Sequence, residues 1–146
     1  MRKAATTLFS AALAITIPFA AHSASYETQD SYDDAVFSVR EAIIGKGLVI
    51  DDEAHIGDML ARTRADVGSE VELFTGAKAF GFCSATVSRQ VIEADITNVQ
   101  FCPYHIYVYE AAAAPGTVHV GFPDYPGETM APVRELLDEI VREALR

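Results

Sequence analysis

Tryptophan is absent from this sequence of 146 residues, and cysteine is scarce, with only Cys83 and Cys102 present. The two cysteines form no C-x-x-C motif, which argues against a thioredoxin-like redox site. We also find no G-x-S-x-G, no phosphate loop ending in Gly-Lys-Ser/Thr, no G-x-G-x-x-G and no H-E-x-x-H. Because no spacing of serines, histidines or carboxylates selects a catalytic set, the sequence names no catalytic residue.

Basic residues are few, with 11 lysines and arginines against 21 aspartates and glutamates. Removal of Arg2 and Lys3 with the N-terminal segment described below leaves 9 basic residues against 21 acidic ones, a net charge of −12. Such a field repels phosphate backbones and anionic lipids, so we expect neither nucleic acid nor a membrane surface as a partner. A cationic partner or metal ion would be attracted, although an acidic surface also serves solubility alone.

The first residues resemble a secretory signal peptide. The positive pair Arg2-Lys3 precedes an apolar run from Leu8 to Ala21, and Ala21-His22-Ser23 has the small-x-small pattern of signal peptidase sites. The run is shorter than the roughly 20 residues of a membrane span. We therefore expect residues 1–23 to be a cleaved signal peptide and residues 24–146 to form one periplasmic or secreted domain. The alternative is a retained N-terminal anchor helix.

Hydrophobic periodicity predicts a mixed α+β domain. Apolar residues repeat at spacings of three and four in the expected helices and alternate in the expected strands. The expected helices are 32–44, 55–65, 85–94 and 132–144. The expected strands are 25–29, 48–50, 78–83, 101–110 and 117–122, with 70–74 as a candidate edge strand. The acidic run Asp51-Asp52-Glu53 is expected to be a solvated turn rather than a cation site.

The expected strand 101–110 is unusual because both of its faces are apolar. One face carries Phe101, Pro103, His105, Tyr107 and Tyr109, and the other carries Cys102, Tyr104, Ile106 and Val108. An antiparallel sheet with one face in water normally alternates apolar and polar residues. We therefore expect a second copy of the chain or a bound molecule to cover the face that the helices leave open.

Several short motifs follow one another along the chain: SYDDAVFSVREAI with a Gly-x-Gly, LVIDD, Gly81-Phe82-Cys83, VIEAD and Pro103-x-x-x-Tyr107-Val108-Tyr109-Glu110. Their order resembles the domain-of-unknown-function family 302 over about Tyr26 to Leu145. The resemblance implies a two-layer α+β sandwich, similar to the fold of the TATA-binding protein. It also implies a curved, mostly antiparallel sheet with helices on one face, and a homodimer. It implies no catalytic residues, because the family has no established biochemical function.

The cysteines depart in part from the family's pattern. Gly81 and Cys83 match a common Gly-x-Cys, but Tyr104 stands where the family commonly has a cysteine after Pro103, and Cys102 lies two residues earlier. The resemblance therefore implies a thiol pair that is displaced rather than lost. In an oxidising compartment two cysteines allow one disulfide, which would contribute about 3 kcal/mol by closing a short loop. Two buried, inert thiols are the alternative.

The candidate site residues cluster around the two cysteines. A small ligand could contact Cys83, Cys102, Tyr104, His105 and Tyr107, although aromatic residues in strands also simply fill a core. A metal ion or haem would draw its ligands from Cys83, Cys102, His105 and His119. Cys102 and His105 point to opposite faces of a regular strand, and the face of His119 depends on register. The cofactor therefore stays unassigned.

These observations lead to three hypotheses. The first is a non-enzymatic exported homodimer that joins through the open sheet face and holds a small ligand or metal near Cys83, Cys102, Tyr104 and His105. The second is a thiol-dependent enzyme or redox sensor that uses Cys83, which precedes a helix whose N-terminus would lower a thiol pKa. The third is a carrier of a metal or haem.

Overall fold

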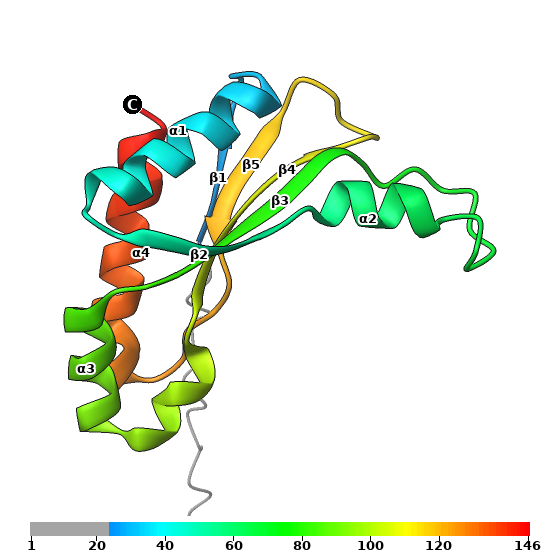
Figure 1. Ribbon diagram of the computed structural model, residues 1–146. Helices are drawn as coiled ribbons and strands as arrows, with labels where there is room; N and C mark the ends of the chain where they lie inside the picture. Colours follow the sequence, from blue (N-terminus) through cyan, green and yellow to red (C-terminus); the bar gives the residue numbers. More distant parts are fainter. Residues whose placement is uncertain (1–23) are drawn as a thin grey trace, which may run out of the picture.

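The computed structural model describes residues 24–146, which form one sheet and the helices packed on it (Figure 1). The strands are β1 (Ala24–Thr28), β2 (Val49–Ala54), β3 (Phe74–Cys83), β4 (Tyr104–Ala111) and β5 (Val118–Phe122). The helices are α1 (Tyr32–Gly45), α2 (Ile56–Thr63), α3 (Ala85–Ala94), α4 (Ala131–Ala144) and the short 3-10 helices η1 (Ile96–Phe101) and η2 (Glu128–Met130). Among these residues, every helix falls short of the length and apolar character that a bilayer span needs.

The five strands form one antiparallel sheet in the order β1-β5-β4-β3-β2. Strands β2 to β5 are neighbours in chain order, whereas β1 pairs with β5 at the edge opposite β2. The chain therefore crosses the whole sheet between β1 and β2, and α1 makes this crossing (Figure 1). The predicted α+β fold with an antiparallel sheet is confirmed.

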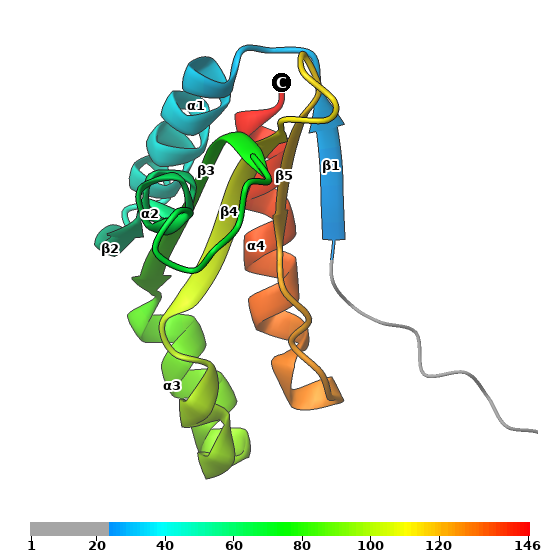
Figure 2. The same cartoon turned by 90° about the vertical axis from the view of Figure 1, so that its right-hand side faces the viewer.

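One face of the sheet is covered by helices. Figures 1 and 2 show α1 and α4 on the same side, with α3 at one end of the sheet. Alternate residues of the three central strands point to this side and are fully buried: Phe80, Phe82, Ile106, Val108, Val118 and Val120. The helices complete the core with Val39, Ile43, Val133, Leu137, Ile140 and Val141. Figure 2 looks onto the other side, which we call the open face, where only α2 and the segment after it stand before the sheet.

The predicted starts of two helices are confirmed by their capping bonds. The Ser31 hydroxyl accepts a hydrogen bond from the Asp34 backbone N–H at 3.1 Å, and α1 begins at the next residue. The Ser84 hydroxyl accepts from the Val87 N–H at 3.3 Å, and α3 begins at Ala85. Each cap satisfies one of the backbone donors that a helix leaves without a partner at its N-terminus.

Strand β1 is fastened to α4 by a polar contact on the helix-covered side. The Tyr26 hydroxyl donates to Asp138, and Arg142 donates to the Tyr26 oxygen at 3.0 Å while its guanidinium lies 5.2 Å from the ring centroid. The hydrogen bond to Asp138 and burial raise the pKa of Tyr26, so the phenol stays protonated as a donor. This contact helps to hold an edge strand of five residues, which has only one neighbour in the sheet.

The predicted strand 101–110 is wrong at its start, because β4 begins at Tyr104. Phe101 ends η1, and Cys102 precedes Pro103 through a cis peptide bond. Proline has no N–H to donate to a neighbouring strand, which explains why the ladder begins after it. The predicted alternation is confirmed from Tyr104 onward, since Tyr104, Ile106 and Val108 are buried while His105, Tyr107 and Tyr109 remain partly exposed.

Two further predictions on the neighbouring strands need correction. The acidic run 51–53 lies within β2 and is not a turn, because Glu53 points inward to two basic side chains described below. The candidate edge strand 70–74 does not form. Instead β3 begins at Phe74 and is longer than the predicted 78–83, because residues 76–82 all find partners on β4.

Candidate functional site

The two cysteines form a disulfide at one end of the sheet. Cys83 ends β3 and Cys102 precedes β4, with an S–S distance of 2.11 Å and a Cα–Cα distance of 6.4 Å. The bond joins the two ends of the segment between β3 and β4, which contains α3 and η1. Residues 24–146 therefore contain no free cysteine, and Cys83 has no thiolate to act as a nucleophile while the bond is intact.

Polar aromatic residues surround the disulfide on the helix-covered side. The Tyr104 hydroxyl lies 3.0 Å from the Ser88 Oγ, which is itself 3.9 Å from the Cys102 Sγ. Tyr125 meets Tyr104 edge to face at 5.8 Å, and its hydroxyl accepts from the His105 backbone N–H at 2.9 Å. Burial raises the pKa of both Tyr104 and Tyr125. Burial therefore keeps these phenols neutral, and both hydroxyls have hydrogen-bond partners within the fold.

The open face carries a row of partly exposed aromatic rings across β3, β4 and β5. His119 stacks on Tyr109 with centroids 4.7 Å apart, because the two residues are directly opposite each other in the sheet. Phe74 meets the Tyr109 ring edge to face at 5.6 Å, and Tyr107 lies 5.9 Å from it. The His119 Nδ1 is 3.8 Å from the Glu27 carboxylate on β1. We call Phe74, Tyr107, Tyr109 and His119 the aromatic row.

Two glycines make room for rings on this face. A Cβ at Gly121 would lie 2.6 Å from the Tyr107 Oη and would also meet the Ala24 carbonyl oxygen, so the Tyr107 ring can lie flat only over a glycine. A Cβ at Gly81 would lie 3.3 Å from the His105 Nε2. Tyr107 lies over Gly121 and His105 lies over Gly81. Because glycine has no Cβ, both rings lie close to the backbone of the neighbouring strand.

The predicted ligand cluster is therefore divided between the two faces of the sheet. Tyr104 packs with the disulfide on the helix-covered side, whereas His105 and Tyr107 lie on the open face. The physical reason is the two-residue period of a strand, which points successive side chains to opposite sides. The five residues Cys83, Cys102, Tyr104, His105 and Tyr107 do not converge on one point.

The predicted metal ligands are also separated. The disulfide uses both sulfur atoms. His105 lies four residues from Tyr109, the partner of His119, which places the two histidines about 13 Å apart along the strands. Zinc–nitrogen bonds measure about 2.0–2.1 Å, so these imidazoles cannot share an ion. Within residues 24–146 no group of three or more His, Cys, Asp or Glu side chains is placed to hold a metal ion.

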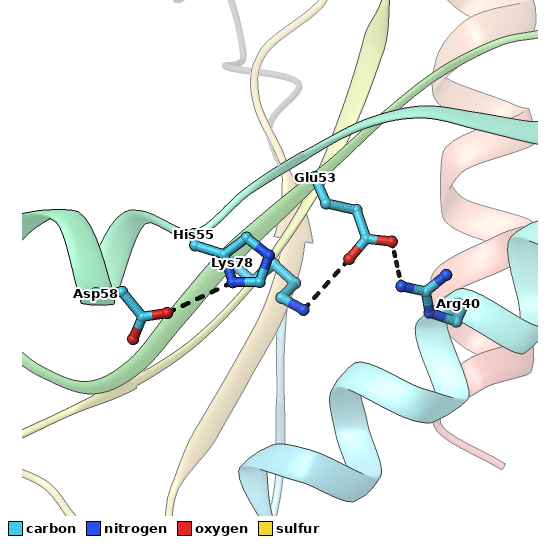
Figure 3. A network of polar contacts seen from close by, with 5 residues as sticks. All are labelled: Arg40, Glu53, His55, Asp58 and Lys78. Carbon is cyan, nitrogen blue, oxygen red and sulfur yellow. Dashed lines mark hydrogen bonds and ion pairs between the residues drawn. The ribbon is translucent and has the colours of Figure 1, made fainter.

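Periodicity alone missed a charged cluster between β2, β3 and α1. Glu53 forms ion pairs with Arg40 of α1 and with Lys78 of β3, the latter at 3.3 Å (Figure 3). Both cations also lie over the Phe80 ring, at 5.8 and 5.7 Å from its centroid. Burial opposes ionisation of Glu53, but the hydrogen bond from Lys78 and the charge of Arg40 outweigh it and lower the pKa of the carboxyl. The cluster fastens edge strand β2 to α1.

The second feature that periodicity missed is a cavity in the segment 56–73, which we call the arm. It contains α2 and the irregular chain that follows, and it projects from the sheet on the side opposite α1 and α4 (Figures 1 and 2). No residue of α2 is buried, and Met59 is exposed. The cavity has a volume of about 140 Å³. The sequence could not predict this cavity. One wall is α2 and the other is the irregular chain after it, and the path of an irregular segment does not follow from hydrophobic periodicity.

Comparison with known proteins agrees with this architecture. A sequence model of the family described as "Domain of unknown function DUF302" matches residues 24–146. Among solved structures, the chain is similar to the "uncharacterized conserved protein DUF302 from Bacillus stearothermophilus", with 14% identity, a TM-score of 0.61 and coverage of 86% of this chain and 94% of that one. At this identity the likeness shows the fold alone. The search of curated proteins found no significant match.

Proposed function

The chain belongs to the family of domains of unknown function DUF302, and from this premise we propose that it is an exported, non-enzymatic binding module that forms a homodimer through its open face. The aromatic row carries this proposal. Tyr107, Tyr109 and His119 stay partly exposed on a sheet face that α1 and α4 do not cover. Exposed tyrosines are often found at the centre of protein interfaces. Binding of a partner buries the large apolar ring, and the hydroxyl can form a hydrogen bond with the partner.

A second copy is the simplest cover for this face. A two-fold dimer brings the same patch of both subunits together, so each aromatic row would bury the other. A stable interface buries about 800 Å² on each partner. His119 beside Glu27 and Asp52 beside Gly81 supply polar groups at the margins, where interfaces normally carry them.

Export is supported by the order of features at the N-terminus. The family match and β1 both begin at Ala24, directly after the expected cleavage site. The predicted signal peptide itself, residues 1–23, lies outside the described residues. A disulfide between Cys83 and Cys102 fits a periplasmic or secreted protein, because such compartments preserve disulfides and the cytosol does not.

The other two hypotheses receive less support. A thiol-dependent activity at Cys83 would first require reduction of its bond to Cys102. Metal or haem carriage from Cys83, Cys102, His105 and His119 would require ligands that lie on different faces or on distant rows of the sheet. We therefore place a small-ligand site elsewhere in the fold, as argued below.

The dimer can be tested by size-exclusion chromatography with light scattering on the mature protein at micromolar concentration. We expect twice the mass of one mature chain. The variant Tyr107→Glu places a charge in the centre of the proposed interface and should be a folded monomer. Ile96→Glu is the matched control, because Ile96 is 73% exposed on η1 and does not belong to the aromatic row. A monomeric wild-type protein, or a dimer unaffected by Tyr107→Glu, would contradict the proposed interface.

Export has its own test. The protein should be recovered from the periplasm or medium after expression in a bacterium, with an N-terminus at Ala24 or Ser25. An intact N-terminus with Arg2 and Lys3 on membrane-bound protein would instead show that the segment is a retained anchor. This measurement is independent of the oligomeric state.

A further inference from the structure

The arm has apolar side chains that no other part of residues 24–146 covers. Its helix α2 has eight residues, too few for stability in water without packing, yet none of them is buried. The arm touches the sheet closely at Gly57, where a Cβ would lie 2.8 Å from the Ala77 backbone nitrogen. The cavity lies between α2 and the chain that follows it, and it is open to solvent, because the lining residues Val67, Val71 and Leu73 remain exposed.

The walls of the cavity are mainly apolar. They come from both sides of the arm and from the first residue of β3: Leu60, Ala61, Val67, Val71, Leu73 and Phe74. The volume of about 140 Å³ is close to the roughly 150 Å³ of an apolar cavity that accepts benzene. The cavity therefore accommodates a branched aliphatic group or a single aromatic ring.

Two side chains of opposite charge also line the cavity, Arg64 and Glu72. They do not form an ion pair with each other, and within residues 24–146 neither side chain has a hydrogen bond or ion pair with another residue. This contrasts with Arg40, Lys78 and Arg142, each of which pairs with a carboxylate. A guanidinium and a carboxylate that share one apolar cavity without meeting are complementary to a ligand with both charges.

We propose that the arm cavity binds a free α-amino acid with an apolar side chain. The aliphatic or aromatic side chain fills the cavity, the carboxylate binds the Arg64 guanidinium, and the ammonium binds Glu72. Arginine suits this role because its planar fork donates two parallel hydrogen bonds to one carboxylate. This inference rests on the proposed function as a binding module and assigns it a ligand class and a site.

A purely apolar ligand fits the observations less well. It would fill the cavity but would gain nothing from the two charged side chains, Arg64 and Glu72, that line it. A purely anionic ligand would be attracted by Arg64 and repelled by Glu72 and by the acidic surface as a whole. The zwitterion satisfies both side chains and carries no net charge.

Isothermal titration calorimetry of the mature, disulfide-bonded protein tests the site. The probes are leucine, phenylalanine and glycine, together with leucinamide, which lacks the carboxylate, and 4-methylpentanoate, which lacks the ammonium. We expect leucine or phenylalanine to bind, and glycine and both leucine analogues to bind at least about tenfold more weakly, because each lacks one of the three contacts.

Matched variants separate the cavity from general charge effects. Arg64→Met and Glu72→Gln should each weaken leucine binding at least about tenfold. Arg62→Met and Glu70→Gln change the same charges on exposed neighbours that do not line the cavity, and should alter affinity less than about twofold. All four positions are at the surface of the arm, and circular dichroism with light scattering will show whether each variant keeps its fold and mass.

Three outcomes would overturn the assignment. The first is the absence of binding at millimolar leucine and phenylalanine. The second is equal affinity in Arg64→Met and Arg62→Met, which would place any ligand elsewhere while leaving the binding module intact. The third is binding of leucine to the monomeric Tyr107→Glu variant but not to the wild-type dimer. This result would mean that the partner subunit, and not an amino acid, fills the cavity in the wild-type protein. A monomeric wild-type protein that binds leucine would instead contradict only the proposed dimer.

Discussion

Removal of the Cys83–Cys102 disulfide should lower the free energy of unfolding by about 3 kcal/mol. The estimate follows from the sequence separation of 19 residues, because the bond restricts that loop in the unfolded chain. For a domain of this size the loss corresponds to a decrease in Tm of about 10 °C. The double variant Cys83→Ala/Cys102→Ala is the appropriate perturbation, since alanine leaves no buried hydroxyl without a partner and the Ser88–Tyr104 hydrogen bond remains.

Urea unfolding followed by far-UV circular dichroism measures the loss, at one fixed protein concentration so that dimerisation does not alter the comparison. Reduction of the wild-type protein should reproduce the stability of the double variant, and the double variant itself should not respond to the reductant. The variant should remain dimeric, because the bond lies at the end of β3 and not in the aromatic row. A loss below about 1 kcal/mol would refute the loop-closure reasoning and show that α3 and η1 already restrict this segment without the bond.

Three further predictions test the contacts that fasten the edges of the fold. Glu53→Gln should destabilise the protein by about 1–2 kcal/mol near neutral pH, because it leaves Lys78 without its charge partner. Since the folded-state pKa of Glu53 is lowered, its stabilisation is present above the unfolded pKa of about 4.3 and is lost as pH falls through the folded value. Urea unfolding between neutral and acid pH should therefore show the variant and wild type converging in acid, and a constant difference would contradict this. Gly121→Ala should cost about 1–3 kcal/mol by thermal unfolding, because its Cβ meets Tyr107 and the backbone of β1; Gly45→Ala, with nothing within 4 Å, is the control that should not show this loss. Ser31→Ala should cost about 1 kcal/mol through loss of the α1 cap, and a loss below a few tenths in urea unfolding would show that solvent replaces the cap.

The elements that the sequence predicted well are those with local causes. The helix α3 begins after a serine cap and ends at Ala94, as its own residues indicate. The alternation of β4 from Tyr104 onward also follows from adjacent residues alone. The start of β4 was misplaced because Phe101, Cys102 and Pro103 continue the same alternation, although the disulfide and the missing proline N–H end the ladder there.

The disulfide between the two cysteines agrees with one of the predicted alternatives, and the division of the other candidate site residues between two faces is partly visible in the sequence. Tyr104 and His105 are consecutive, so a strand must point them to opposite faces, and no single ligand on one face can contact both side chains. The charged cluster could not be predicted in the same way. Arg40, Glu53 and Lys78 come from three elements, and only the assembled sheet brings them together. Without that pairing, an acidic run after an apolar segment is typical of a turn.

The two proposed sites are connected through one side chain. Phe74 lines the arm cavity and also meets the Tyr109 ring of the aromatic row edge to face at 5.6 Å. An amino acid that fills the cavity would restrict Phe74 and thereby order Tyr109 before a second subunit binds, which lowers the entropic cost of dimerisation. Coupling between two binding events is reciprocal, so the dimer would bind the amino acid more tightly by the same factor.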